Sequence, residues 1–111
     1  MKIYKALKVA IEAGNHDQIM SFYHEDFEFI RHQTGTAMNK AEFGSMIANY
    51  NSASNTSSTV MSRCIYENDD IIVDHSVTRF PDSSRESIIR VRMIEDGKII
   101  RMETGATQMS A

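Results

Sequence analysis

Apolar residues in the first half of the chain recur at helical spacing in three stretches. The first stretch covers 3–11 and is followed by Gly14, a residue type suited to a left-handed C-terminal cap. Asn15 then matches an N-cap, with Gln18 three residues later, which predicts a short second helix. The apolar stripe of that helix consists of Ile19, Phe22 and Tyr23.

The third helical pattern has the clearest N-terminal signature. Asn39 is a suitable cap, and Glu42, three residues later, completes a capping box. The apolar face of this helix consists of Phe43, Met46, Ile47 and Tyr50. Between the second and third helices, apolar and polar residues alternate over 27–33, which predicts a strand.

After a polar connector at 51–59, the second half of the chain has the pattern of strands throughout. Strands are predicted at 60–66, 71–80, 88–94 and 99–104. They are separated by turn candidates at Asn68-Asp69, 81–84 and Asp96-Gly97. The element order α-α-β-α-β-β-β-β predicts an α+β fold, in which a curved mixed or antiparallel sheet wraps around the three N-terminal helices.

The Asp96-Gly97 turn predicts which residues of the last hairpin face each other. A two-residue turn sets Met93 opposite Ile100 and Val91 opposite Met102. One face of the hairpin is then apolar and is expected inward: Ile89, Val91, Met93, Ile100 and Met102. The opposite face carries Arg90, Arg92, Arg101 and Glu103, which we interpret as a solvated sheet face, with an anion-binding or subunit-contact surface as the alternative.

The first hairpin is less constrained, because either Asn68-Asp69 or Asp69-Asp70 can form its turn. A turn at Asn68-Asp69 sets Arg63 beside Asp74. Asp74 therefore has two interpretations, as the cross-strand partner of Arg63 or as a carboxylate in the interior of the fold.

Composition narrows the class of protein further. The 111 residues fit one domain, 1–111, and the formal net charge of −3 does not favour a nucleic-acid partner. Cys64 is the only cysteine, so no disulfide can form within the chain. The N-terminus does not have the pattern of a signal peptide, and no apolar run has the length of a membrane span. We therefore expect a cytoplasmic protein without a membrane partner.

The segment 13–29, AGNHDQIMSFYHEDFEF, resembles the opening of the nuclear-transport-factor-2-like superfamily, which includes the SnoaL-like polyketide cyclases and the ketosteroid isomerases. The shared features are an A-G-(D/N)-x-D-x-(I/L) helix junction, then an aromatic and an acidic pair before the first strand. The hairpin at 95–102, EDGKIIRM, is similar too. The resemblance implies a cystatin-like cone with a pocket at its open end and homodimerisation through the outer face of the sheet.

The ketosteroid isomerase pattern fails at its catalytic positions. The tyrosine that donates to the oxyanion falls on Leu7, the aspartate that moves the proton falls on Arg31, and the second acid falls near Ile89. An arginine cannot act as a base at neutral pH, and no donor replaces the tyrosine. The sequence therefore excludes ketosteroid isomerase chemistry.

The candidate catalytic residues are Arg31, His32, Asp74 and His75. By the resemblance Arg31 points into the cone, where it holds a carboxylate or phosphate, unless it pairs with an acid such as Asp74 or Glu28. Histidine has an ordinary pKa that permits proton transfer near neutral pH, so His32 is a candidate. However, alternation along the strand sends it to the face opposite Arg31. An ungapped match to the superfamily points Asp74 inward and His75 outward, so that His75 acts as a base only if the strand bulges.

We expect a pocket with an apolar wall formed by Leu7, Phe29, Phe43, Ile47, Tyr66, Ile89, Val91 and Met102. The predicted function is binding of a small, partly apolar and anionic molecule, and in a catalytic version isomerisation, cyclisation or hydration without a cofactor. The alternative is a non-catalytic dimerisation or partner-binding module whose cavity is filled by its own side chains. We predict no metal site, because no set of ligands has suitable spacing.

Overall fold

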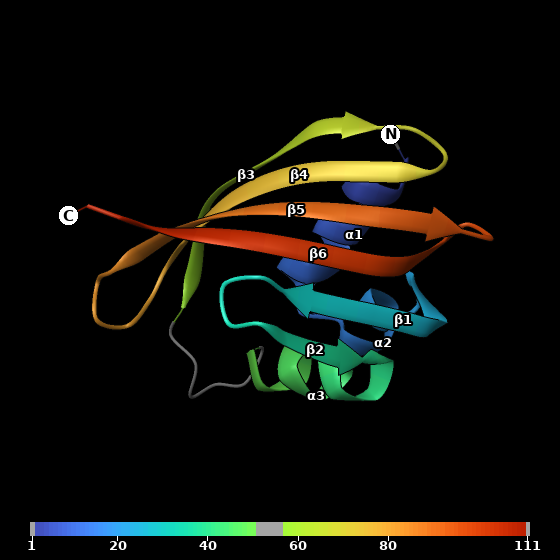
Figure 1. The fold of residues 1–111 in the computed structure, drawn as a ribbon, viewed down its shortest axis with the longest axis horizontal. Coiled ribbons are helices and arrows are strands. Elements are labelled where there is room, and N and C mark those ends of the chain that lie inside the picture. The colour runs from blue at the N-terminus through green and yellow to red at the C-terminus, as the bar shows by residue number, and fades with distance from the viewer. Residues whose placement is uncertain (1, 51–56, 111) are drawn as a thin grey trace.

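The computed structural model describes residues 2–50 and 57–110 of the chain. Within these residues three helices and six strands follow one another along the chain (Figure 1). Their bounds are α1 (Lys2–Ala13), α2 (His16–Met20), β1 (Tyr23–Arg31), β2 (Thr36–Asn39), α3 (Lys40–Tyr50), β3 (Ser58–Glu67), β4 (Ile71–Arg79), β5 (Arg85–Glu95) and β6 (Lys98–Met109). The predicted α+β class is confirmed. Part of the predicted connector, 51–56, lies outside the described residues.

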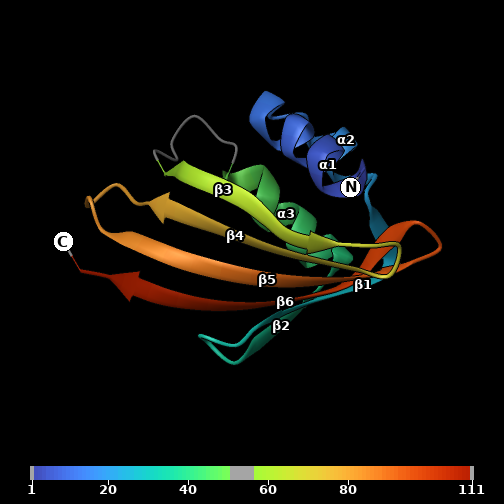
Figure 2. The same ribbon diagram turned by 90° about the horizontal axis from the view of Figure 1, so that it is seen from above.

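The strands form one curved sheet in the order β2-β1-β6-β5-β4-β3. β1 pairs with β6 in parallel, and the other neighbouring strands are antiparallel, so the sheet is mixed. The helices lie on its concave side, and the convex side is free of helices (Figure 2). We call these the inner and outer faces of the sheet. No helix in the described part of the chain is long and apolar enough to cross a membrane.

Local signals position the helix ends as predicted. Gly14 has a φ of 66° and its amide donates to the carbonyl of Ile11, which ends α1. The Asn15 side chain caps α2 by accepting from the amide of Gln18 at 3.1 Å. At α3 the capping box is complete, with both bonds between Asn39 and Glu42 at 2.9 Å.

Two elements differ from the prediction around the second helix. α2 ends at Met20, and Tyr23 begins β1 instead of continuing the helical stripe. The short strand β2 was not predicted; it folds back on β1 through Gly35, whose φ of 70° suits a glycine. The core lies under these elements, where four aromatic rings pack with centroids 4.7 to 5.3 Å apart: Tyr23, Phe27, Phe29 and Phe43.

A β-bulge in the last hairpin reverses the predicted faces. Ile94 pairs with Ile99, but Met93 pairs with Arg101, so Ile100 has no Cα partner on β5. Because side chains alternate along a strand, this one-residue shift turns Arg92 and Met102 to the same side. The prediction that Ile89, Val91 and Met93 face inward and that Arg90 and Arg92 face solvent is therefore wrong. Ile89 is 42% exposed, whereas Arg92 is 6% exposed.

The first hairpin also differs from the predicted register. The turn is Asp69-Asp70, the second of the two predicted alternatives, and it is closed by the Asn68 amide donating to the Ile71 carbonyl at 2.9 Å. With a bulge in β3 at Ile65, Cys64 pairs with Asp74 and Arg63 with His75. The predicted cross-strand pair between Arg63 and Asp74 is wrong. Asp74 lies on the inner face instead, beside Arg90.

Candidate functional site

Five residues from five neighbouring strands form a line of Cα partners across the inner face of the sheet. We call this line the polar row, and it consists of Arg31 on β1, Thr104 on β6, Arg90 on β5, Asp74 on β4 and Cys64 on β3. Residues paired across neighbouring strands point to the same face. Thr104 and Asp74 are buried, at 8% and 2% exposed, which places this line on the inner side.

Asp74 is the anchor of the row. β4 carries buried residues at alternate positions, and three of these are polar: Asp74, Ser76 and Thr78. Its Oδ2 accepts from Nε of Arg92 at 2.6 Å, and Nη1 of Arg92 donates to the Tyr23 hydroxyl at 3.0 Å. These charge-assisted bonds satisfy a buried carboxylate and a buried guanidinium that would otherwise be costly to remove from water. Burial acts to lower the pKa of Arg92, but Tyr23 and Asp74 outweigh it and raise that pKa.

Arg90 is the second cation of the row and is less well compensated. Its Nη1 donates to the Ser76 hydroxyl at 2.8 Å and lies 3.4 Å from Oδ1 of Asp74. Burial, and then the charge of Arg92, lower the pKa of Arg90. Asp74 is therefore the counter-charge of two arginines, and its contact with Arg90 is longer than its contact with Arg92.

Arg31 stands at the other end of the row from Asp74. It follows the inward-facing Phe27 and Phe29 at the same alternation, and it pairs with the buried Thr104. Its side chain is partly exposed and makes no hydrogen bond or ion pair with another residue in the described ranges. Arg31 is separated from Asp74 by the strands β6 and β5, roughly 14 Å of sheet at about 4.8 Å per strand. The predicted ion pair of Arg31 with Asp74 or Glu28 is absent from the described residues.

This arrangement favours binding of negative charge over proton transfer. Three arginines point to the inner face, and the carboxylate among them is occupied by two of them. A guanidinium binds a carboxylate through two parallel N–H···O bonds, and it stays protonated at any physiological pH. The inner face can therefore hold an anion or a developing oxyanion.

The two candidate histidines lie on the outer face. His75 accepts a hydrogen bond at Nδ1 from Nε of Arg63, at 3.1 Å, so in its neutral form Nε2 carries the proton toward Ser87, 2.8 Å away. His32 contacts Glu103 at 2.7 Å, in a network that includes Arg101. Neither ring shares a face with Arg31, and the structure brings neither one to the polar row.

The predicted pocket wall is divided among three environments. Leu7, Phe29, Phe43 and Met102 are buried in the core, and Ile47 packs against them. Tyr66 is 55% exposed and, like Ile89 and Val91, lies on the outer face. The structure therefore does not gather the eight residues around one cavity.

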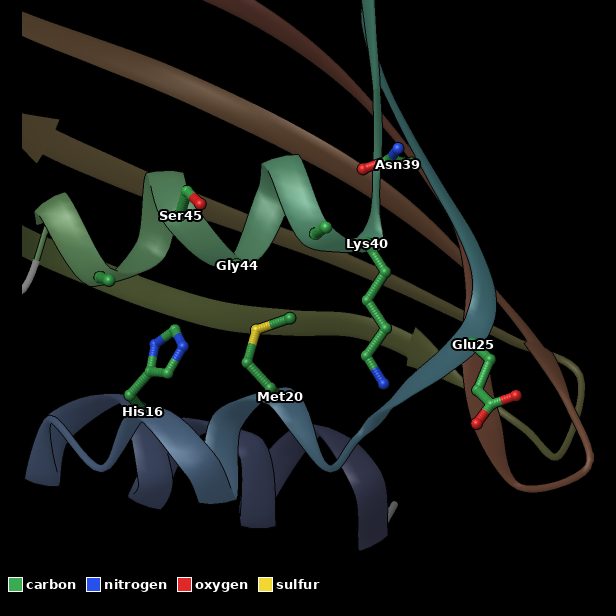
Figure 3. A pocket seen from close by; sticks show the side chains of 9 residues that line it. His16, Met20, Glu25, Asn39, Lys40, Gly44 and Ser45 are labelled. Carbon is green, nitrogen blue, oxygen red and sulfur yellow. The ribbon is translucent and has the colours of Figure 1, made fainter.

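An open groove of about 760 Å³ lies elsewhere, between α2 and α3 (Figure 3). Small residues of α3 line one side of it: Ala41, Gly44, Ser45 and Ala48. Met20 of α2 points toward Gly44, and Lys40 uses its ammonium to bind the Tyr23 carbonyl at 3.0 Å. None of the predicted site residues lines this groove, and its polar groups do not converge on one point.

One group of described residues has metal-ligand types within reach of one another, His24, Glu95 and Asp96. However, Nδ1 of His24 accepts a hydrogen bond from the amide of Asp26, at 3.0 Å. A metal bound at Nε2 requires a proton on Nδ1, which cannot then accept. The hydrogen bonding thus opposes metal binding at this histidine.

Five further residues of this site were not predicted from the sequence: Arg90, Arg92, Tyr23, Ser76 and Thr104. The bulge at Ile100 caused the error for the arginines, because it reversed their face. A usable signal was nonetheless present: a strand with polar residues at alternate positions, Asp74, Ser76 and Thr78, requires polar partners on its neighbour.

The curved, open sheet with helices on its concave side has the cone fold of the nuclear-transport-factor-2-like class. Residues 4–102 match the SnoaL-like domain, and the protein therefore belongs to the SnoaL-like domain family. This confirms the resemblance drawn from the N-terminal segment and the last hairpin. No curated protein matches the chain at a significant level.

Solved structures share the fold at low sequence identity. A nuclear-transport-factor-2-like protein of unknown function from Burkholderia xenovorans superposes with a TM-score of 0.78, 12% identity, and coverage of 99% of this chain and 84% of that one. A candidate polyketide cyclase from Streptomyces antibioticus gives 0.73, 14%, 94% and 88%. A SnoaL-like protein of unknown function from Burkholderia thailandensis gives 0.67, 13%, 93% and 89%. These similarities establish the fold. They do not assign an activity, which has to be argued from the residues of the site.

Proposed function

We propose that this protein binds a small, partly apolar molecule that carries a negative charge, and that Arg31 holds the charged group on the inner face. The observation that supports this proposal is the free guanidinium of Arg31, which lies in the polar row without a partner among the described residues. An arginine of this kind is ready for bidentate binding of a carboxylate or an enolate oxygen. Partly buried apolar side chains that pack against the core, Met38, Met46 and Ile47, offer the apolar contact.

In a catalytic version of this function, the reaction is an isomerisation, hydration or cyclisation without a cofactor. The candidate polyketide cyclase among the structural neighbours favours this class. The inner face would contribute by stabilising an oxyanion as it forms, which is commonly the largest catalytic effect of a polar site. The single cysteine favours a cytoplasmic location for such a protein.

A thermal-shift experiment tests the proposal. Benzoate and octanoate are the probes, and benzamide and octanamide are their uncharged counterparts. A ligand that binds the folded state raises the melting temperature in proportion to the logarithm of its concentration over Kd. We expect a shift with the acids that Arg31→Met abolishes and that Arg101→Met, a change on the outer face, preserves. If the acid shift survives Arg31→Met, Arg31 does not hold the charge.

The second candidate function is dimerisation through the outer face. Its support is a set of exposed apolar side chains on the convex side, Tyr66, Ile89 and Met93, which are 55%, 42% and 37% exposed. Sedimentation velocity on the full chain tests it. We expect a homodimer that Ile89→Lys converts to a monomer, while Val9→Lys, at an exposed position of α1, leaves the dimer intact. A monomeric wild type would contradict this candidate.

A further inference from the structure

We infer that Arg90 is a second ligand for the bound anion and that the site takes a monocarboxylate between Arg31 and Arg90, over Thr104. This inference rests on the proposed function, because it assumes that the inner face binds an anion. To the proposed function it adds Arg90 as a second binding residue and a monocarboxylate as the class of ligand.

The geometry of the polar row supports a shared site. Thr104 pairs with Arg31 on one side and with Arg90 on the other, so the two arginines lie two strands apart on the same face. Two strand spacings are roughly 9.6 Å, at about 4.8 Å each. Long side chains that lean toward each other across that distance can both form N–H···O bonds of about 2.8 Å to one carboxylate. Thr104, on the strand between them, contributes a hydroxyl to the same face.

Arg90 is held in a way that leaves part of its guanidinium available. Only Nη1 is used within the described residues, by Ser76 at 2.8 Å and by Asp74 at 3.4 Å. The edge formed by Nε and Nη2 has no protein partner in those ranges, and such an edge can bind a carboxylate with two parallel bonds. Its side chain is 22% exposed, whereas that of Arg92 is 7% exposed and is occupied at both Nε and Nη1.

The charge of the inner face selects a monoanion. In the polar row and the next line of Cα partners, the cations are Arg31, Arg90 and Arg92, and the carboxylates are Asp74 and Glu67. These two lines carry three positive charges against two negative charges, and a third carboxylate on the same face makes the totals equal. Glu86 is also on this face, four residues before Arg90 on β5, where it accepts from Gln33, and its charge disfavours a dianion such as a phosphate monoester.

Asp74 then has the role of a positioning residue and not of a base. Its two oxygens hold Arg92 and Arg90, and Ser76 holds the same nitrogen of Arg90 from the next inward position. Both oxygens already accept hydrogen bonds from arginine nitrogens, so the carboxylate is engaged in holding those two side chains. Ser76→Ala should therefore weaken carboxylate binding by loosening Arg90, without changing the affinity for an uncharged analogue.

The experiment is an NMR titration of the full chain with benzoate, benzamide and phenyl phosphate. We expect Arg31→Met and Arg90→Met each to weaken benzoate binding by about tenfold to a hundredfold, as for loss of a charged hydrogen bond, and to leave benzamide binding unchanged. Arg101→Met is the matched control, since it removes an arginine from the outer face. Arg90→Lys, which keeps the charge but not the planar fork, is included in case Arg90→Met does not fold, and we expect it to lose affinity as well.

The outcomes separate the two proposals. If wild type binds none of the anions, the proposed function is wrong. If benzoate binding is lost in Arg31→Met but is unchanged in Arg90→Met and Arg90→Lys, the proposed function stands and the role of Arg90 is overturned. Phenyl phosphate binding more tightly than benzoate would overturn the assignment of the ligand as a monocarboxylate. Ser76→Ala that weakens benzoate and benzamide equally would contradict the positioning role.

Discussion

Nε of Arg92 lies 2.6 Å from Oδ2 of Asp74, in an ion pair whose side chains are 7% and 3% exposed. The two residues lie on neighbouring strands and are not Cα partners, since Asp74 pairs with Arg90 and Arg92 pairs with Ile72. The contact is therefore a diagonal one. It connects β4 and β5 to the aromatic core, because Arg92 also donates to the Tyr23 hydroxyl.

Asp74→Asn should strongly destabilise the fold, because it leaves two arginines on the inner face without their counter-charge. We expect the free energy of unfolding to fall by about 3–5 kcal/mol, the usual cost of removing one partner of a buried ion pair. Urea denaturation followed by circular dichroism measures it. Asp69→Asn, at an exposed turn position, is the control and should change stability by less than about 0.5 kcal/mol. Equal effects of both substitutions would contradict the buried-pair assignment.

Two methionines of the last hairpin test the reversed faces. Met102 is 3% exposed in the core, and Met93 is 37% exposed on the outer face, although the bulge-free register places both inward. Met102→Ala should lower the free energy of unfolding by about 2–5 kcal/mol, and Met93→Ala by less than about 1 kcal/mol. Chemical denaturation at low protein concentration gives both values. A larger loss at Met93 would support the register without the bulge.

The capping box at the start of α3 is a local contribution to stability. Asn39 accepts from the amide of Glu42, so Asn39→Ala leaves that donor without its partner. We expect a loss of about 1 kcal/mol in the free energy of unfolding. Asn49→Ala, at an exposed position in the same helix, should have almost no effect and controls for the amide itself. A negligible loss at Asn39 would show that the cap contributes nothing to stability.

The hydrogen bonds of Glu103 lead us to predict that the stability of the fold depends on pH. Hydrogen bonds from Arg101, and then from His32, lower its pKa in the folded protein below 4.5. A carboxyl group whose pKa is lower in the folded state stabilises that state above its unfolded pKa, and the contribution is lost as the pH falls through the folded pKa. We therefore expect Glu103→Gln to flatten the fall of the unfolding free energy between about pH 5 and pH 3.

Glu12→Gln is the control for this pH profile. Glu12 is exposed on α1 and has no ion-pair partner among the described residues. Its substitution should leave the slope of the unfolding free energy against pH as in the wild type. A profile for Glu103→Gln that coincides with that of Glu12→Gln would show that the outer network of Arg101 and His32 does not stabilise the fold.

The sequence by itself determined the elements whose signals are local. The caps at Gly14, Asn15 and Asn39 and the turn at Asp96-Gly97 were readable because each depends on a few neighbouring residues and their backbone preferences. The aromatic and acidic segment that enters β1 identified the family for the same reason. The resemblance to the superfamily also placed Arg31 on the inner face, and the placement holds because β1 pairs regularly with β6 over 28–31.

Only the tertiary structure decided the register of the first hairpin and the faces that β5 shows in the last one. One extra residue at Ile100 and another at Ile65 each shift the strand pairing by one position. Because side chains alternate between the two faces along a strand, a shift of one position exchanges the faces. A bulge has no strong local sequence signal, and it is stabilised here by distant contacts such as those of Arg92 with Asp74 and Tyr23. The polar row therefore exists because pairing between strands far apart in the sequence, and not the hydrophobic pattern of either strand, sets the register.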